Sequence, residues 1–181
     1  VLLCPGTGQS GFEGFGKVVS GEVNPSGRTV DTYVSNMKNS PWWNNFGDFK
    51  YTNADDLASD VSFFDPEGTT ASFVNYVEGI YVGYKFYETA AAEGFINYDD
   101  EVVFPFGYGL SYTSFTKEMS NITNDGTNLN FTVTVTNTGS VAGKDVVEIY
   151  SNPPYTNGGI EKASANLVDF AKTNELAPGE S

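Results

Sequence analysis

The fold of this chain is decided by the stretch LNFTVTVTNTGS, which occupies residues 129–140. Apolar and polar residues alternate from Leu129 to Thr136, which is the pattern of a β-strand with one buried and one solvated face. The Asn, Thr, Gly and Ser residues at 137–140 are turn formers. The stretch therefore predicts a half-buried strand that ends in a turn.

Two further stretches in the same half predict strands, at residues 145–150 and 166–171. Short strands separated by turn signals are typical of a β-sandwich. The sequence stops at a turn, Pro178 to Ser181, and three or four strands are too few to close a sandwich. From about residue 113 onward we therefore expect a truncated β-sandwich domain.

The first half has a different sequence pattern, in which helical and strand periodicities alternate with loops rich in Gly and Pro. The elements expected there are strands at 1–4, 29–34 and 76–87 and helices at 9–20 and 88–93. Residues 104–112, FPFGYGLSY, hold too much Pro and Gly for a regular element and predict a packed aromatic connector. The expected fold class is mixed α/β, with one domain at residues 1–112 and a second at 113–181.

Composition excludes several classes of function. The chain has 181 residues, with Lys and Arg totalling 9 against 23 Asp and Glu, for a net charge of -14. Nucleic acids and anionic membranes need basic patches, so neither is an expected partner. The absence of His excludes Ser-His-Asp and Cys-His sites, and the single cysteine, Cys4, excludes an internal disulfide or a thiolate zinc cluster. Carboxylate, hydroxyl, lysine or tyrosine chemistry remains.

Two glycine patterns near the start imitate nucleotide-binding motifs. GTGQSG at residues 6–11 has the spacing of a dinucleotide fingerprint with Asp31 beyond it, but the required βαβ unit lacks a parallel partner strand. Residues 11–17 have P-loop spacing, yet Val18 stands where a Ser or Thr would hold Mg²⁺. We interpret both as coincidences, expect no cofactor and no metal, and keep a nucleotide-binding protein as a distant alternative.

The aromatic and acidic side chains suggest carbohydrate chemistry. Trp42 and Trp43 are the candidate substrate-binding residues, because indole faces stack on sugar rings, although they could equally fill the core beneath their loop. Glycoside hydrolysis uses two carboxyl groups, but acid runs such as Asp55-Asp56 and Asp99-Asp100-Glu101 are usually solvated surface. Glu78 lies inside an expected strand and, if buried, needs a partner; Lys85 and Arg28 are the candidates.

Two short motifs have the form of N-glycosylation sequons, Asn121-Ile122-Thr123 and Asn130-Phe131-Thr132. Such motifs matter only in a eukaryotic secreted context. The sequence shows no signal peptide and no stretch of roughly 20 apolar residues that would span a membrane. The compartment therefore stays open, with the cytoplasm slightly favoured.

Taken in order, several blocks resemble the C-terminal half of glycoside hydrolase family 3, the β-glucosidase family. The blocks are PGTGQ at 5–9, GEVNPSGR at 21–28, YVEGIYVGYKFY at 76–87, FPFGYGLSY at 104–112, VTNTG at 135–139, LVDF at 167–170 and LAPGE at 176–180. The WNNFG block at 43–47 is similar to bacterial members. The resemblance implies that residues 1–112 are the last part of an α/β sandwich domain and that residues 113–181 begin a fibronectin type III-like domain.

The resemblance also implies a retaining enzyme that acts on terminal β-linked sugars, in an oligosaccharide or an aryl glycoside. Members of the family have an Asp nucleophile on a barrel domain and a Glu acid/base that precedes the segment matched here. No catalytic residue is therefore carried over to this sequence, and the segment alone is expected to be inactive. The barrel would be its partner within the same protein. A non-catalytic carbohydrate-binding or adhesion module is the alternative.

Overall fold

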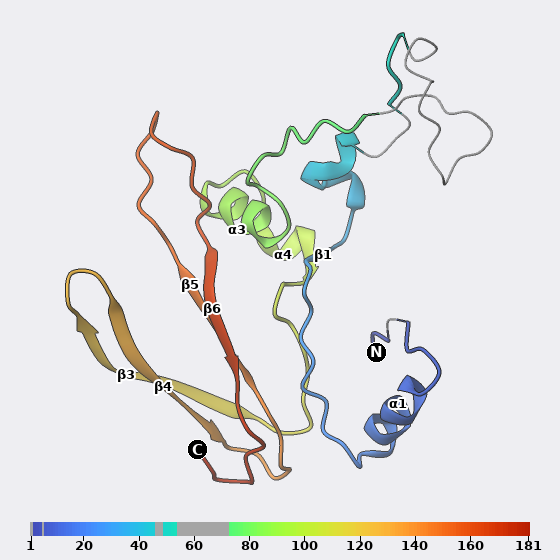
Figure 1. The fold of residues 1–181 in the computed structure, drawn as a ribbon, viewed down its shortest axis with the longest axis vertical. Coiled ribbons are helices and arrows are strands. Elements are labelled where there is room, and N and C mark those ends of the chain that lie inside the picture. The colour runs from blue at the N-terminus through green and yellow to red at the C-terminus, as the bar shows by residue number, and fades with distance from the viewer. Residues whose placement is uncertain (1, 5, 46–48, 54–72) are drawn as a thin grey trace. The chain divides into compact units, whose positions relative to one another are not determined.

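The computed structural model describes residues 2–4, 6–45, 49–53 and 73–181, and it mixes helices with antiparallel strand pairs (Figure 1). Its elements in chain order are α1 Gly11–Ser20, β1 Tyr33–Val34, the 3₁₀ helices η1 Met37–Asn39 and η2 Pro41–Asn45, α3 Tyr84–Ala92, α4 Tyr98–Glu101, β2 Val102–Phe104, β3 Phe115–Asn124, β4 Leu129–Asn137, β5 Val146–Ser151 and β6 Asn166–Lys172. None of the helices in the described ranges has the length and apolarity needed to cross a bilayer.

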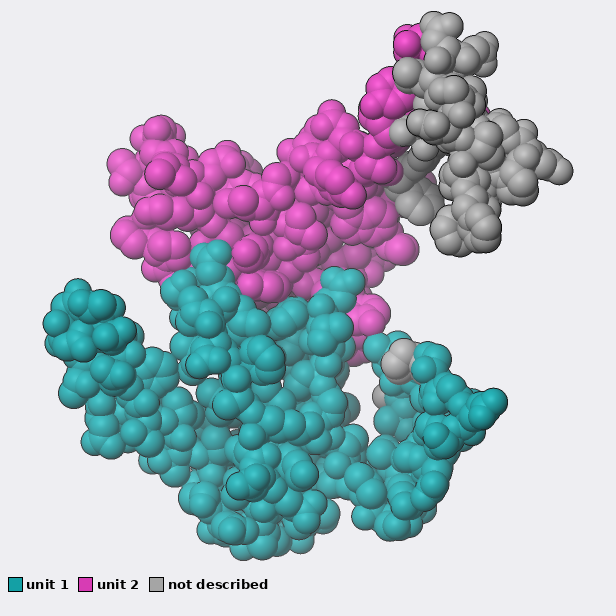
Figure 2. All heavy atoms as spheres, viewed as in Figure 1, with its two compact units in different colours: residues 1–31, 106–151, 166–181 teal, residues 32–105, 152–165 magenta. Residues whose placement is uncertain are grey.

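The chain divides into two compact units (Figure 2). Unit 1 comprises residues 1–31, 106–151 and 166–181, and unit 2 comprises residues 32–105 and 152–165. Unit 1 holds α1 and the strands β3 to β6, whereas unit 2 holds the remaining helices and the short β1–β2 pair. The mixed α/β class expected from the sequence is therefore confirmed.

The strands of unit 1 form two antiparallel pairs. In the β3–β4 hairpin Lys117 lies opposite Val135, and the register shifts between Ser120 and Thr123. In the second pair, β5 runs against β6 with Val147 opposite Ala171. The strands expected at 129–136, 145–150 and 166–171 are confirmed, because β4, β5 and β6 occupy these positions with bounds that differ by one residue. Strand β3 was not predicted.

A buried amide organises the core of unit 1. The side chain of Asn137 is fully buried, and its Nδ2 donates to the carbonyl oxygens of Val141 and Leu176, each at 2.8 Å. Its Oδ1 accepts from Thr113 Oγ1 at 2.7 Å and from the Gly139 backbone N–H at 3.1 Å. These four bonds use every donor and acceptor site of the amide. Asn137 therefore ties the end of β4 to both the following loop and the C-terminal segment.

Helix α3 is the centre of unit 2. It buries Tyr87 and Ala90, and the Tyr87 hydroxyl lies 2.9 Å from Ser40 Oγ. The segment 152–165, which connects β5 to β6, also contacts this helix: the Ser164 backbone N–H donates to Thr89 Oγ1 at 2.9 Å. Ala163, one residue earlier, is 1% exposed. The unit is thus built from segments far apart in the sequence that converge on one short helix.

The strand expected at 76–87 is wrong. Residues 77–80 form turns and α3 begins at Tyr84. Gly79 and Gly83 both adopt φ of 57°, a left-handed conformation that interrupts an extended strand. Beyond Gly83, the aromatic residues Tyr84 and Tyr87 have a spacing of three, which is helical.

The other elements expected in the first half have mixed outcomes. The helix at 9–20 is confirmed as α1, and the helix at 88–93 is confirmed in its position, although α3 starts earlier. The strand at 29–34 shrinks to Tyr33–Val34, and residues 2–4 are not a strand, while residue 1 lies outside the described residues. The connector at 104–112 has no regular structure after Phe104, as its Pro and Gly content indicates.

Candidate functional site

The candidate sugar-binding residues lie on η2 of unit 2. Trp42 and Trp43 are both half-buried, and their ring centroids are 6.2 Å apart with the planes tilted by 53°. The Trp43 backbone N–H donates to the carbonyl of Ser40 at 3.0 Å, and the Ser40 hydroxyl is bonded to Tyr87 of α3. The pair is therefore fixed to the centre of the unit, and both residues remain partly accessible to solvent.

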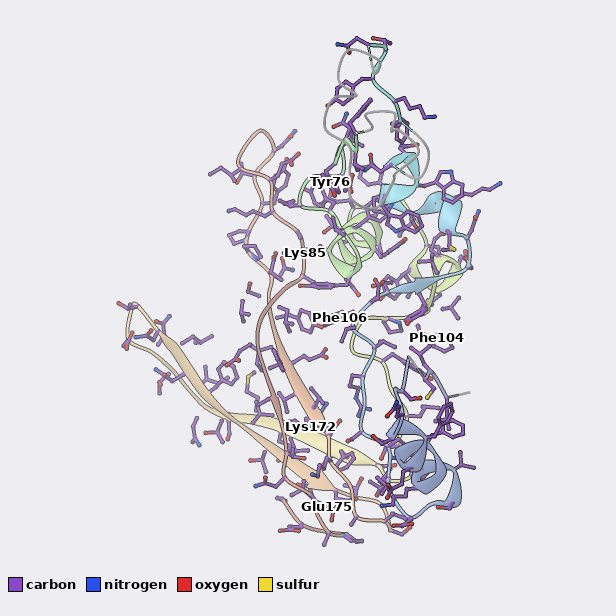
Figure 3. All side chains as sticks on the ribbon, turned by 45° about the vertical axis from the view of Figure 1, so that its right-hand side comes forward. Tyr76, Lys85, Phe104, Phe106, Lys172 and Glu175 are labelled. Carbon is purple, nitrogen blue, oxygen red and sulfur yellow. The ribbon has the colours of Figure 1, made fainter. Side chains whose placement is uncertain are left out.

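Glu78 lies beside the same 3₁₀ helix. It is half-buried, and its Oε2 accepts from Asn45 Nδ2 at 2.8 Å. The partner is thus an amide at the end of η2, and not Lys85, which belongs to α3 (Figure 3), or Arg28. Lys85 and Arg28 were candidates for a buried Glu78. The residue is in a turn and only half-buried, so its charge does not require a cation. Two aromatic rings, an amide and a carboxylate are groups that bind sugars.

The remaining acidic candidates have local structural roles. On α4, Asp100 Oδ2 accepts from Asn97 Nδ2 at 2.8 Å, and Glu101 Oε1 accepts from Asn39 Nδ2 at 3.0 Å. Asp99 and Asp100 are exposed, which agrees with their interpretation as solvated surface. Asp55 and Asp56 lie outside the described residues. In the part of the chain that the structure describes, no group of three or more Cys, Asp or Glu side chains could hold a metal ion.

The strongest electrostatic feature is a buried carboxylate in unit 1. Asp145 is 4% exposed, with Oδ1 2.7 Å from Arg28 Nη2 and Oδ2 3.0 Å from Lys117 Nζ. Burial by itself raises the pKa of Asp145, but the hydrogen bonds from Lys117 and Arg28 prevail and hold that pKa below its ordinary value. The carboxylate therefore stays ionised and engaged by two cations.

A second polar contact fixes the segment that carries Arg28. Asn24 Nδ2 donates to the Ala142 carbonyl at 3.0 Å, and its Oδ1 accepts from Ser111 Oγ at 3.0 Å and from the Tyr112 backbone N–H at 2.8 Å. Gly143 allows this approach, because a Cβ there would lie 2.5 Å from Asn24 Nδ2. We call residues 24–28, with their contacts to residues 111–112 of the 104–112 connector and to Ala142 and Asp145 before β5, the Asn24–Arg28 bracket.

A polar hollow of about 410 Å³ lies beside the bracket, lined in part by Arg28, Lys117 and Glu148. A second hollow of unit 1 is lined in part by Lys172 and Glu175, which Figure 3 labels. In the first hollow, both cations are engaged by Asp145, and Glu148 Oε2 accepts from Tyr150 Oη at 2.8 Å. The charged groups that line it are therefore already satisfied.

Sequence reasoning missed the Asp145 cluster. Arg28 and Asp145 are separated by 117 positions, so no local pattern brings them together. The one available signal was an acid at the start of the apolar stretch VVEIY, where burial demands a cationic partner.

Comparison with known proteins finds relatives along nearly the whole chain, although no family model matches it. β-Glucosidase A of Butyrivibrio fibrisolvens is 32% identical over 96% of this chain and 20% of its own length, and a β-glucosidase of Ruminococcus albus is 37% identical over 96% and 15%. A crystallised β-glucosidase of Paenibacillus barengoltzii superposes with a TM-score of 0.70 at 34% identity, over 94% of this chain and 16% of that one. The GH3 β-glucosidase of Bifidobacterium adolescentis gives 0.71 at 30%, over 95% and 21%.

These similarities extend along nearly the whole chain, but the chain spans only 15–20% of the length of the curated relatives. In class, it is a segment of glycoside hydrolase family 3. It aligns with one part of each of these β-glucosidases.

Proposed function

We propose that this segment is the non-catalytic scaffold of a retaining β-glucosidase that acts on terminal β-linked sugars. The nucleophile and the acid/base would belong to polypeptide outside these 181 residues, including a barrel domain that packs with the segment. The observation that carries the proposal is that the Asp145 carboxylate is buried and bonded to two cations. It is the buried acid among the described residues, and two cations hold it, so it cannot attack a sugar or exchange a proton near neutral pH.

The proposal also divides the chain into two domains. Residues 1–112 would form the end of an α/β sandwich domain, and residues 113–181 would begin a fibronectin type III-like domain. The secondary structure supports this division, because every long strand of the described residues follows Tyr112 and the helices precede it. The Asn24–Arg28 bracket would then be the joint, since Asn24 and Arg28 hold Ala142 and Asp145.

The test is hydrolysis of a chromogenic aryl β-glucoside. The complete enzyme should release the chromophore, and the purified 181-residue chain should give no turnover above buffer. Adding the separately produced remainder of the protein to the chain tests the scaffold role directly, because a scaffold that packs on the barrel should raise or restore activity. Saturable hydrolysis by the chain alone would refute the proposal.

A second candidate function is a carbohydrate-binding module, which the half-buried Trp42 and Trp43 favour. In this case, or as part of the substrate site of the complete enzyme, the indole rings would stack on a sugar. Titration of glucose or cellobiose against tryptophan fluorescence separates the candidates. A binding module gives saturable quenching that is lost in Trp42→Ala, whereas a scaffold gives none.

A further inference from the structure

The two sequons identified in the sequence lie on a single hairpin of unit 1. Asn121 belongs to β3 and Asn130 to β4, and the two strands pair with Thr123 opposite Asn130. A third site, Asn24-Pro25-Ser26, has the same outer residues but a Pro in the middle, which excludes it as an acceptor. The chain therefore contains two allowed sequons and one natural negative control.

The backbone presents Asn121 outside the regular strand ladder. Its φ is 53°, and it is the one non-glycine residue with positive φ in the described part of the chain. The β3–β4 register shifts between Ser120 and Thr123, so Asn121 lies in the irregular stretch. Asparagine tolerates this left-handed conformation better than most residues. The bulge thus directs an exposed amide away from strand pairing.

Asn130 is also accessible, although it lies in the regular ladder. Its side chain and that of Thr132, the third residue of its sequon, are both exposed. This contrasts with Asn24 and Asn137, whose amides are used in the hydrogen bonds of the bracket and the core. Within the described residues, exposure and the sequon pattern coincide at the two hairpin positions.

Exposed apolar side chains surround the two sequons. Met119, Ile122 and Leu129 are 61%, 57% and 61% exposed. The sheet that carries them has two strands among the described residues. Its outer edge is bonded to Gly179 and Glu180 at Asn137, and it is open around Asn121 and Asn130. Open edges with exposed apolar side chains promote association between chains. A hydrated oligosaccharide at Asn121 or Asn130 would shield this surface.

We infer that Asn121 and Asn130 are N-glycan acceptors whenever the chain passes through a compartment that holds an oligosaccharyltransferase. The donor is a lipid-pyrophosphate-linked oligosaccharide. The asparagine amide nitrogen forms a bond to C1 of the first sugar, the bond from C1 to the pyrophosphate oxygen breaks, and the amide loses one proton. Lipid pyrophosphate is the leaving group. This inference is independent of the proposed hydrolase function.

The experiment is cell-free translation of the chain, behind a cleavable signal sequence, with microsomes from a eukaryotic cell. Glycan number is read by mass before and after treatment with an amidase that removes N-glycans. We expect two glycans on the parent chain, one on each of Asn121→Gln and Asn130→Gln, and none on the double variant. Because glycan number is read by mass, a variant that folds poorly still gives a reading.

Three further variants decide between the sequons and incidental modification. Thr123→Ala should remove the glycan of Asn121, and Thr123→Ser should restore it. Asn24→Gln should leave the number at two. Failure of the amidase to change the mass of the parent chain, or glycans that persist in the double variant, would overturn the inference.

Discussion

Separating Arg28 from Asp145 should destabilise unit 1 far more than breaking a surface ion pair. The side chains of Asp145 and Arg28 are 6% and 15% exposed, and their atoms lie 2.7 Å apart. Removing one partner of a buried pair leaves an uncompensated charge, which costs about 3 kcal/mol or more. Lys117 is 44% exposed, so its bond to Asp145 contributes roughly 0.5–1 kcal/mol after solvent screening. We therefore expect Arg28→Met to lower the free energy of unfolding by about 3 kcal/mol and Lys117→Met by about 1 kcal/mol or less.

The assay is urea unfolding at pH 7, followed by far-ultraviolet circular dichroism. The double variant Arg28→Met with Asp145→Leu should lose less stability than the sum of its single variants, because it leaves neither charge unpaired. The matched control is Lys17→Met, which breaks the exposed Lys17–Glu13 pair of α1 at 2.9 Å and should cost roughly 0.3–0.5 kcal/mol. Equal losses for Arg28→Met and Lys17→Met, or additive losses in the double variant, would show that Arg28 and Asp145 do not stabilise unit 1 as a buried pair.

Three further predictions concern pH and single side chains. The pKa of Asp145 is lower in the folded protein, so its stabilisation is fully present above the unfolded pKa of about 3.9 and is lost as pH falls through the folded pKa. Asp145→Asn should therefore weaken the loss of stability at acid pH. An unchanged dependence of the free energy of unfolding on pH would contradict this. Asn137→Ala should cost about 3 kcal/mol in urea unfolding, because it orphans buried carbonyls as well as losing hydrogen bonds; a loss below about 1 kcal/mol would count against its central role. Ser40→Ala and Tyr87→Phe should each cost about 1 kcal/mol and the pair no more than either alone, as a thermal-melt cycle would show; independent losses would exclude the shared hydrogen bond.

Local periodicity predicted the elements whose own residues define them. The alternation from Leu129 to Thr136 identifies β4, and the spacing of Phe12, Phe15 and Val19 identifies α1. It missed β3, because KEMSNITN has few apolar residues in alternation and most of its side chains are exposed. It misassigned 76–87, because an aromatic stretch with Gly every few residues fits a strand until the left-handed glycines are known.

The candidate sites were predictable only in part. The Trp pair is read directly from the sequence, and its fixed, half-buried setting depends on Ser40 and Tyr87, which are 47 positions apart. The Asp145 cluster depends on contacts over more than a hundred positions, which a local pattern cannot supply. Ordered similarity of several blocks to family 3 therefore predicted the family better than any individual residue did.

The location of the reactive carboxylate shows most directly whether this segment is a non-catalytic scaffold. A 2-deoxy-2-fluoro glucoside with a good leaving group traps the covalent intermediate of a retaining glycosidase on its nucleophile. Peptide mapping of the labelled complete enzyme should find the sugar on an acid outside residues 1–181. A label on any Asp or Glu within these residues would contradict the proposal that this segment is a scaffold.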